Sequence, residues 1–352
     1  MSRPFLIAAL LFLLTGCTPP ASSAPSASPS PSSEPSATVT ASPIASASAS
    51  APSTSATPIP LPNTAQLSAP SANVVWALVA GSRIFRSIDR GETWQERSAA
   101  LNPVGLNREI AFVSDSEGWL ATPGSPGTQC TFQSVGIAHT TDGARWDTLV
   151  VAGTPGSPSS SGIADRQCKS GFAFADSQRG YLGAWDPNSR PIIYRTADGG
   201  RSWNASSPVP DPPGFTTQPA VGALRVGLVR AFRTTLLVSA SGGSDGRLAS
   251  YVFSSSDGGS WAYQATVPQG EGALAFVTAS RWLLMSTPGA SQETTDGGRT
   301  WHDFATDYSQ AAPIAPEVVF GDPLVGYATV RGAIQRTIDG GTHWTSIKTP
   351  GT

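Results

Sequence analysis

Charged side chains are scarce in this sequence, at 13% of 352 residues against the roughly 25% that is usual in soluble domains. The 22 basic and 24 acidic residues leave a formal net charge of −2, so bulk electrostatic attraction gives no reason to expect a nucleic-acid partner. Histidine is rarer still, and His139, His302 and His343 form no cluster with metal-ligand spacing, so neither a metal nor a cofactor is expected. The 36 glycines and 31 prolines disfavour helices, because both residues break helix interiors.

Cysteine is almost absent, and the first of three cysteines, Cys17, closes a segment with the features of an export signal. One cation, Arg3, precedes an apolar run over residues 5–14, which is too short to span a bilayer stably. The run ends in Leu14-Thr15-Gly16-Cys17, which resembles the lipobox of bacterial lipoproteins. The resemblance implies that residues 1–16 are a signal peptide and that a lipid on Cys17 anchors the exported protein to a membrane, facing outside the cytoplasm. The alternative is an ordinary signal peptide with an incidental cysteine.

The segment that follows the lipid-attachment residue has little apolar mass. Residues 17–67 consist mainly of Ser, Ala, Pro and Thr, which cannot offset the entropy of ordering, so we expect a disordered tether. A flexible coil of this length spans roughly 35 to 40 Å. The predicted organisation is therefore a signal peptide (1–16), a lipid-anchored tether (17–67) and a folded domain (68–352).

One short pattern recurs six times in the rest of the chain. Its full form starts with Ser or Thr, has Asp third and Gly fifth, and ends in Trp eighth; two copies are one residue shorter. The Asp and Trp residues of the six copies are Asp89 and Trp94, Asp142 and Trp146, Asp198 and Trp203, Asp257 and Trp261, Asp296 and Trp301, and Asp339 and Trp344. The pattern resembles the Asp-box, or BNR repeat, of sialidases, sortilin-type receptors, some xyloglucan hydrolases and photosystem II assembly factors. We call each copy a box.

The residue types of the box indicate a tight hairpin turn. Glycine permits a positive φ at the turn, and the Asp carboxylate can accept backbone N–H groups across it. The Trp ring is large enough to pack between neighbouring sheets. We therefore interpret the six aspartates as structural and not catalytic.

Apolar strands surround the boxes in a regular order. Phe174-Ala175-Asp176 leads to Gly180-Tyr181, and Phe320-Gly321-Asp322 leads to Gly326-Tyr327, so each element supplies two strands and a turn. A third strand enters the box and a short fourth strand follows its Trp. Four antiparallel strands per repeat are typical of a β-propeller blade. The combination resembles the photosystem II assembly-factor propellers and their lipoprotein relatives, a resemblance that is specific for the fold and weak for function.

The spacing of the boxes predicts the number of blades. Six boxes indicate an all-β propeller of six four-stranded blades, with seven blades as the alternative if one blade is degenerate. The innermost strand of the first blade is the least distinct, because only residues 64–70 are available for it.

The length in excess of a bare blade falls in connections on the face opposite the boxes, around the second, third and fourth blades. Binding sites often lie on such loops, so we take this face as the candidate binding rim. Its candidate residues are Arg166, Lys169, Trp185, Arg190 and Arg247. The alternative is that these loops are filler decorated with solvated cations. Cys130 and Cys168 lie in neighbouring loops of the same face, so we expect a disulfide between them.

The motifs of common enzyme classes are missing. The sequence has no Gly-rich phosphate loop, nucleophile elbow or Ser/His/Asp arrangement. The sialidase F-R-I-P element has no match, and the nearest string, Arg83-Ile84-Phe85, lacks the proline. We expect a non-catalytic, monomeric surface propeller that binds a protein or glycan, with a photosystem role as one special case. The alternative is a divergent glycosidase of sialidase or xyloglucanase type that uses Arg166, Arg190 and Arg247.

Overall fold

The computed structural model describes residues 65–97, 108–124, 130, 133–150, 161–165, 167–215, 224–244, 247–270, 272–309, 317–330 and 333–350. All described residues belong to one compact unit, Pro58–Thr352. The signal peptide (1–16), Cys17 and the tether as far as residue 64 lie outside the described residues, so they stay predictions. Within the ranges described, no helix is long and apolar enough to cross a membrane.

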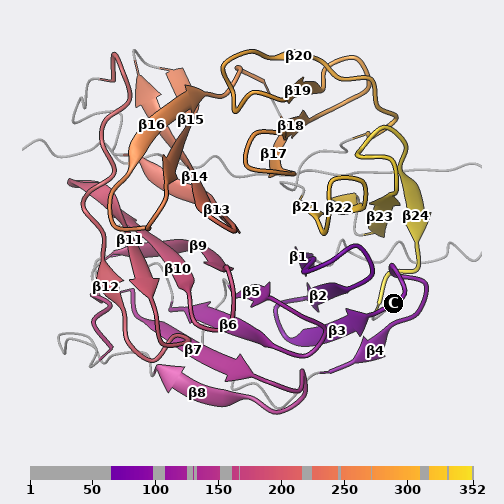
Figure 1. The fold of residues 1–352 in the computed structure, drawn as a ribbon, viewed down its shortest axis with the longest axis horizontal. Coiled ribbons are helices and arrows are strands. Elements are labelled where there is room, and N and C mark those ends of the chain that lie inside the picture. The colour runs from indigo at the N-terminus through magenta and orange to yellow at the C-terminus, as the bar shows by residue number, and fades with distance from the viewer. Residues whose placement is uncertain are drawn as a thin grey trace, which may run out of the picture. The chain divides into compact units, whose positions relative to one another are not determined.

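Six sheets of four antiparallel strands follow one another along the chain and form a ring (Figure 1). In every sheet the order in space is the order in sequence. Blades 1 and 2 contain β1 (Ala65–Ser68), β2 (Val75–Val79), β3 (Arg83–Ser87), β4 (Gln95–Glu96), β5 (Glu109–Phe112), β6 (Gly118–Pro123), β7 (Val135–Thr140) and β8 (Asp147–Val150). Blades 3 and 4 contain β9 (Cys168–Phe174), β10 (Gly180–Asp186), β11 (Ser189–Thr196), β12 (Asn204–Ala205), β13 (Arg225–Phe232), β14 (Thr235–Ser244), β15 (Arg247–Ser255) and β16 (Ala262–Thr266). Blades 5 and 6 contain β17 (Ala273–Phe276), β18 (Trp282–Met285), β19 (Gln292–Thr294), β20 (His302–Asp303), β21 (Val318–Phe320), β22 (Gly326–Val330), β23 (Ala333–Thr337) and β24 (Thr345–Ile347).

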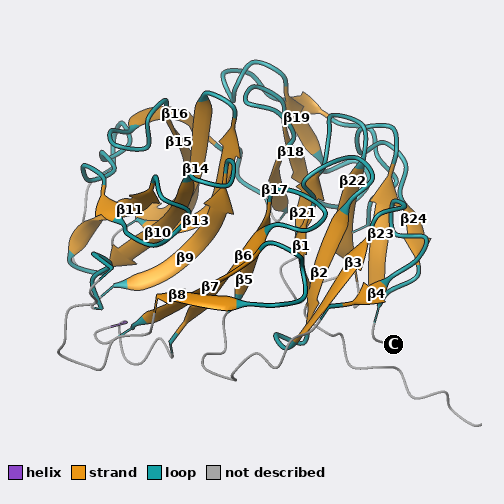
Figure 2. Cartoon of the chain, turned by 60° about the horizontal axis from the view of Figure 1, so that its bottom comes forward, coloured by secondary structure: helices purple, strands orange, loops and turns teal. Residues whose placement is uncertain are grey.

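This architecture confirms the predicted six-bladed, all-β propeller, in which strands and loops carry the described chain (Figure 2). The innermost strand of the first blade is β1, within the short stretch available for it. One boundary needs correction, because the predicted tether ends at residue 67 whereas β1 begins at Ala65. The reason is that Leu67, only 3% exposed, is an apolar core residue that pairs with Ala77 in the neighbouring strand.

Six hydrophobic cores hold the ring together, and each of them lies between two consecutive blades. The core between blades 2 and 3, for example, joins Trp119 and Ile137 to Leu182, Tyr194 and the box residue Trp203. Every box Trp packs in the core that its blade shares with the preceding one, as the sequence predicts. Cores between separate sheets explain why a box without its neighbours could not be stable.

Stacked aromatic rings strengthen two of these interfaces. Trp76 of β2 stacks on Phe112 of the next blade at a centroid distance of 3.7 Å, and Trp119 of β6 stacks on Phe174 at 3.6 Å. The Phe in each case ends the innermost strand, at the element that precedes the box. Its recurrence in the sequence is therefore explained by contact with the preceding blade.

The ring closes through contacts between blade 6 and blade 1, since no strand is exchanged between them. Trp94 donates its indole N–H to the carbonyl of Lys348 at 2.8 Å. Arg336 Nη1 donates to the carbonyl of Arg90 at 2.9 Å and also pairs with Glu92. Contacts made by side chains therefore close the ring, in place of a blade built from both ends of the chain.

Candidate functional site

Each box closes its turn with the same small hydrogen-bond network. In blade 1 the Ser87 hydroxyl donates to Asp89 Oδ1 at 2.7 Å and accepts the Gly91 N–H at 2.7 Å. Asp89 in turn accepts the N–H of Thr93 at 2.9 Å and its hydroxyl at 2.5 Å. The bond from hydroxyl to carboxylate recurs in the other five boxes at 2.7 to 3.3 Å. The Asp residues therefore serve as acceptors that hold the turn.

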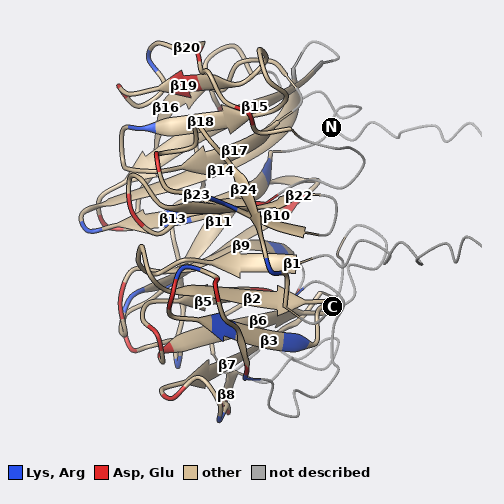
Figure 3. Ribbon diagram, turned by 90° about the vertical axis from the view of Figure 1, so that its right-hand side faces the viewer, with Lys and Arg blue, Asp and Glu red and all other residues tan. Residues whose placement is uncertain are grey.

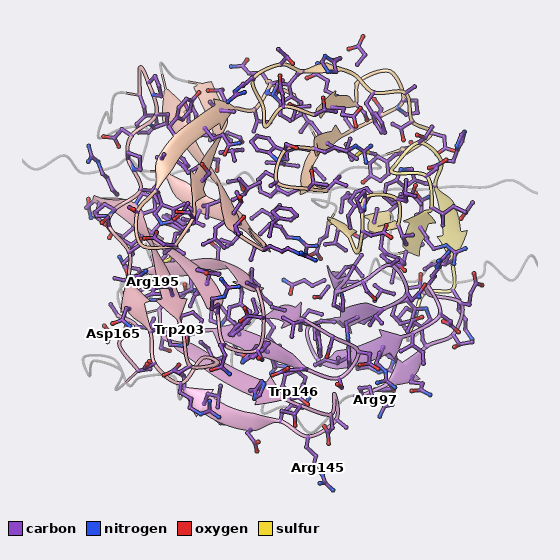
Figure 4. All side chains as sticks on the ribbon, in the orientation of Figure 1. Arg97, Arg145, Trp146, Asp165, Arg195 and Trp203 are labelled. Atoms are coloured by element: carbon purple, nitrogen blue, oxygen red, sulfur yellow. A yellow bond between two sulfur atoms is a disulfide. The ribbon has the colours of Figure 1, made fainter. Side chains whose placement is uncertain are left out.

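The electrostatics of the boxes agree with this role. The hydrogen bond from the Thr93 hydroxyl holds the pKa of Asp89 at about 2, below its ordinary value of 3.8. The backbone N–H of Arg145 likewise lowers the pKa of Asp142. A carboxylate that stays ionised and occupied by turn donors is unsuited to act as a general acid. Figure 3 shows many acidic residues in turns at the ends of strands. The side chain of Arg145, a residue of the second box, points away from the ring (Figure 4).

The aspartates that follow the innermost strands have a similar role. Asp176 Oδ1 accepts the N–H groups of Gln178 and Arg179 at 3.0 and 2.8 Å. Asp322 Oδ1 accepts those of Leu324 and Val325 at 2.8 and 2.6 Å. These carboxylates cap turns on the same face as the boxes.

On the opposite face, a disulfide joins Cys130 to Cys168 and so fastens blade 2 to blade 3. Cys130 lies in the connection between β6 and β7, and Cys168 begins β9, with 5.0 Å between their Cα atoms. Cys130 has a φ of +54°, a conformation that non-glycine residues seldom adopt. The structure thus brings together the two cysteines that the sequence places in neighbouring loops.

Lys169, next to this disulfide, is not part of the exposed rim. Its side chain is buried, at 5% exposure, and its Nζ donates to the carbonyls of Gln133, Ala164 and Gln167 at 3.0, 2.5 and 2.6 Å. Burial lowers the pKa of Lys169 to about 8. The prediction of Lys169 as a binding-rim residue is wrong, because irregular backbone in two connections leaves carbonyls that the buried ammonium group satisfies.

Trp185 and Arg190 lie on either side of the turn between β10 and β11 in blade 3. Trp185 is half-buried near the end of β10, and the guanidinium carbon of Arg225, an exposed residue of β13, lies 5.1 Å from its ring centroid. Arg190 is exposed and pairs with Asp211 in the connection to blade 4. Leu248 of β15 is 74% exposed. We call Trp185, Arg190, Asp211, Arg225 and Leu248 the exposed rim.

Two predicted rim residues stay predictions, since Arg166 and the side chain of Arg247 lie outside the described residues. Arg225 is a rim residue that was not predicted from the sequence. The sequence does contain a signal for Arg225, because this isolated arginine opens the first apolar strand after a long connection. A charge in that position would ordinarily be interpreted as solvated.

A cavity of about 350 Å³ lies among the innermost strands, with lining residues from all six blades. Glu109 and Glu317 stand at the rim end of their strands. Glu109 accepts the N–H groups of Gly171 and Phe172 at 3.1 and 2.8 Å, and Glu317 accepts the N–H of Leu67 at 2.7 Å. Each glutamate thereby ties its own innermost strand to that of the next blade.

Burial raises the pKa values of both glutamates. Desolvation raises the pKa of Glu109, and it raises the pKa of Glu317 to about 8 with repulsion from Glu109 as a further cause. Arg230 of β13 also lines the cavity, and its Nη2 donates to the carbonyl of Phe320 in blade 6 at 2.6 Å. The sequence signal that was missed is the repeated string of Glu three residues before a strand-ending Phe, in Glu109 to Phe112 and Glu317 to Phe320.

A metal site is not evident, as no group of three or more His, Cys, Asp or Glu residues within the described ranges is arranged to hold an ion. Of the three arginines in the alternative glycosidase set, only the side chain of Arg190 lies within the described residues. Arg190 pairs with Asp211 at the exposed rim and does not line the cavity.

Comparison with known proteins supports the fold and little else. No family model matches the chain, and no curated protein matches it in sequence. Its structure is similar to AofleA from Arthrobotrys oligospora, with a TM-score of 0.50 and 13% identity over 83% of this chain and 88% of that one. It also resembles YCF48 bound to D1 peptide (TM-score 0.44, 18% identity, 82% of each chain) and the α-L-arabinofuranosidase Arb93A from Fusarium graminearum (0.49, 12%, 82% of this chain and 93% of that one). At these identities the similarity shows the propeller fold alone.

Proposed function

We propose that this protein is a non-catalytic, lipid-anchored propeller that binds a protein or glycan partner outside the cytoplasm through its exposed rim. The observation that carries the proposal is the pairing of Trp185 with Arg225 on the face opposite the boxes. Aromatic rings and guanidinium groups are enriched in binding surfaces, since they combine contact area with directed hydrogen bonds.

The strands that carry the exposed rim are held rigidly, which favours binding. Trp185 pairs directly with Cys168 in the β9–β10 ladder, so the disulfide fixes the strand beside it. The buried ammonium group of Lys169 ties the same strand to two connections. A rigid surface loses less conformational entropy when it binds.

The anchor and tether complete the proposal. A lipid on Cys17 would hold the protein at the membrane, and residues 18–64 would let the propeller move over roughly 35 to 40 Å. Such reach suits a domain that captures a partner near the membrane surface.

The test compares two faces of the same molecule. Trp185→Ala combined with Arg225→Ala should lower the affinity for glycans or envelope proteins that bind the wild type by at least tenfold. Arg299→Ala removes an exposed arginine from the box of blade 5 and should leave binding unchanged. Equal loss in both variants, or loss in Arg299→Ala alone, would place binding elsewhere.

The second candidate, a glycosidase, is favoured by one observation: the raised pKa values of Glu109 and Glu317 beside a cavity. Both carboxylates already accept backbone N–H groups, which argues for a structural role. Aryl glycosides incubated with wild type and Glu317→Gln separate the two functions. Turnover by wild type that Glu317→Gln abolishes would support the enzyme.

A further inference from the structure

Arg230 is a cation inside the ring without a carboxylate partner among the described residues. Its only hydrogen bond there is from Nη2 to the Phe320 carbonyl, at 2.6 Å. Its guanidinium carbon also lies 5.9 Å from the ring centroid of Phe232, a weak contact. A carbonyl and an aromatic ring do not neutralise the charge, so this partly buried guanidinium would gain from an anionic partner.

The other charged groups of the cavity do not supply the missing charge. The charged lining residues are Arg230, Glu109 and Glu317, and no ion pair joins the arginine to either glutamate. Both carboxyl groups already accept N–H groups from the neighbouring blade. The pKa of Glu317, at about 8, leaves that group mostly protonated at neutral pH.

The connections that lead into the innermost strands contain few acidic residues that could pair with Arg230. Residues 98–107, 216–223 and 310–316 contain neither Asp nor Glu. Glu271, just before β17, is the one acidic residue in a connection to an innermost strand that lies outside the described ranges. Among the described lining residues, Arg230 is therefore the one cation, and it has no ion-pair partner.

We propose that the central cavity binds a small molecule that carries a single carboxylate, which pairs with the free edge of the Arg230 guanidinium. Nη2 is engaged by Phe320, while Nε and Nη1 have no partner in the described part of the chain. The second N–H of Nη2 forms a fork with the neighbouring N–H of Nε or of Nη1, and such a fork matches the two oxygens of a carboxylate. A volume of about 350 Å³ suits a molecule the size of a monosaccharide or a short organic acid.

The two glutamates give this site a pH dependence with a definite sign. Below about pH 8 the Glu317 carboxyl is protonated and does not repel an anion. As pH rises above that value Glu317 becomes ionised, and Glu109 is the only other acid that lines the cavity. Affinity for the carboxylate should therefore fall between pH 7 and pH 9, and Glu317→Gln should remove most of that fall.

The experiment titrates the mature protein with sodium glucuronate, sodium lactate and sodium acetate, with glucose as the uncharged counterpart of the sugar acid. The NMR signal of the Arg230 Nε–H group and calorimetry report binding. We expect the carboxylates to shift that signal and glucose to leave it unchanged. The affinities for glucuronate and lactate are then compared to show whether a sugar acid or a short acid fits the cavity better.

Matched variants test whether Arg230 is the cation that binds the carboxylate. Arg230→Met should weaken carboxylate binding at least tenfold, and Arg233→Met, an exposed arginine at the β13–β14 turn, should not change it. If Arg230→Met does not fold, the Nε–H signal of the wild type still decides the question. No shift with any carboxylate, or an equal loss of affinity in Arg233→Met, would overturn the proposal. Carboxylate binding that appears only in Glu271→Gln would also overturn it, because Glu271 would then be the natural counter-ion.

Discussion

At the scale of single residues, the same chemical group has opposite roles in different surroundings. Asp89 on the box face is ionised and held by turn donors, whereas Glu317 in the cavity is desolvated and protonated near neutral pH. Sequence patterns identify the first role well, since a repeated Asp beside Ser or Thr and Gly specifies local hydrogen bonds. They do not identify the second, because desolvation depends on the strands of five other blades.

The box carboxylates predict an acid-sensitive contribution to stability. The pKa of Asp89 is about 2 in the folded protein and near 3.8 when exposed, so its contribution is present above about pH 4 and is lost as pH falls toward 2. Asp89→Asn should lower Tm at pH 7 by about 1 to 3 °C, the size of one lost charge-assisted bond.

Thermal unfolding at pH 7, 4 and 2 checks this prediction. The difference in Tm between wild type and Asp89→Asn should shrink as the pH approaches 2. Asp147→Asn, at an exposed residue of β8, serves as the control and should change Tm little at any pH. A difference that grows on acidification would contradict the role assigned to the box aspartates.

Lys169 shows at the same scale where sequence reasoning fails. Cations near polar connections are normally solvated, and nothing in the sequence marks the carbonyls of Gln133, Ala164 and Gln167 as partners. Those acceptors belong to the backbone and become available only when two connections fold over β9.

At the scale of elements, repeats made the fold predictable. Six boxes gave the number of blades, because each box sits at the turn between the third and fourth strands of one sheet. The sequence predicts the repeated, strand-ending Phe174, but it does not predict the stacking of Phe174 on Trp119. Interfaces between blades are tertiary contacts that no local pattern encodes.

At the scale of elements, we also expect the disulfide to stabilise the rim locally. Cys130 and Cys168 are separated by 38 residues, and closing a loop of that length stabilises by roughly 3 to 4 kcal/mol in the chain-entropy model. The double variant Cys130→Ser with Cys168→Ser should lower the free energy of unfolding in urea by up to that amount.

Hydrogen exchange distinguishes a local from a global effect. In the double variant, amides of β9 and of residues 161–165 should exchange faster, whereas those of β21 to β24 should be unchanged until global unfolding. Free-thiol labelling of the non-reduced wild-type propeller should modify neither cysteine. Full labelling of both would contradict the pairing.

At the scale of the whole molecule, contacts between side chains close the propeller. The contacts of Trp94 and Arg336 join the first blade to the last, so the chain needs no exchanged strand. The sequence predicted the ring but not how it closes. The N-terminal anchor and the tether stay predictions that rest on Leu14-Thr15-Gly16-Cys17 and on composition.

Membrane attachment is testable in cells. Cys17→Ser should move the protein from the membrane fraction to the soluble fraction, or leave the precursor unprocessed, because the thiol that accepts the lipid is gone. Mass spectrometry of wild type should find a lipid on an N-terminal Cys17. An unmodified mature N-terminus at another residue would exclude the lipoprotein interpretation.

The central claim is that the exposed rim, and not the box face, receives the partner. The most direct measurement is hydrogen exchange of the mature protein with and without a bound protein or glycan partner. We expect slower exchange near the end of β10, at the start of β11 and at the start of β13, and unchanged exchange in the boxes. Protection confined to the box turns, with Trp185 and Arg225 unaffected, would contradict it.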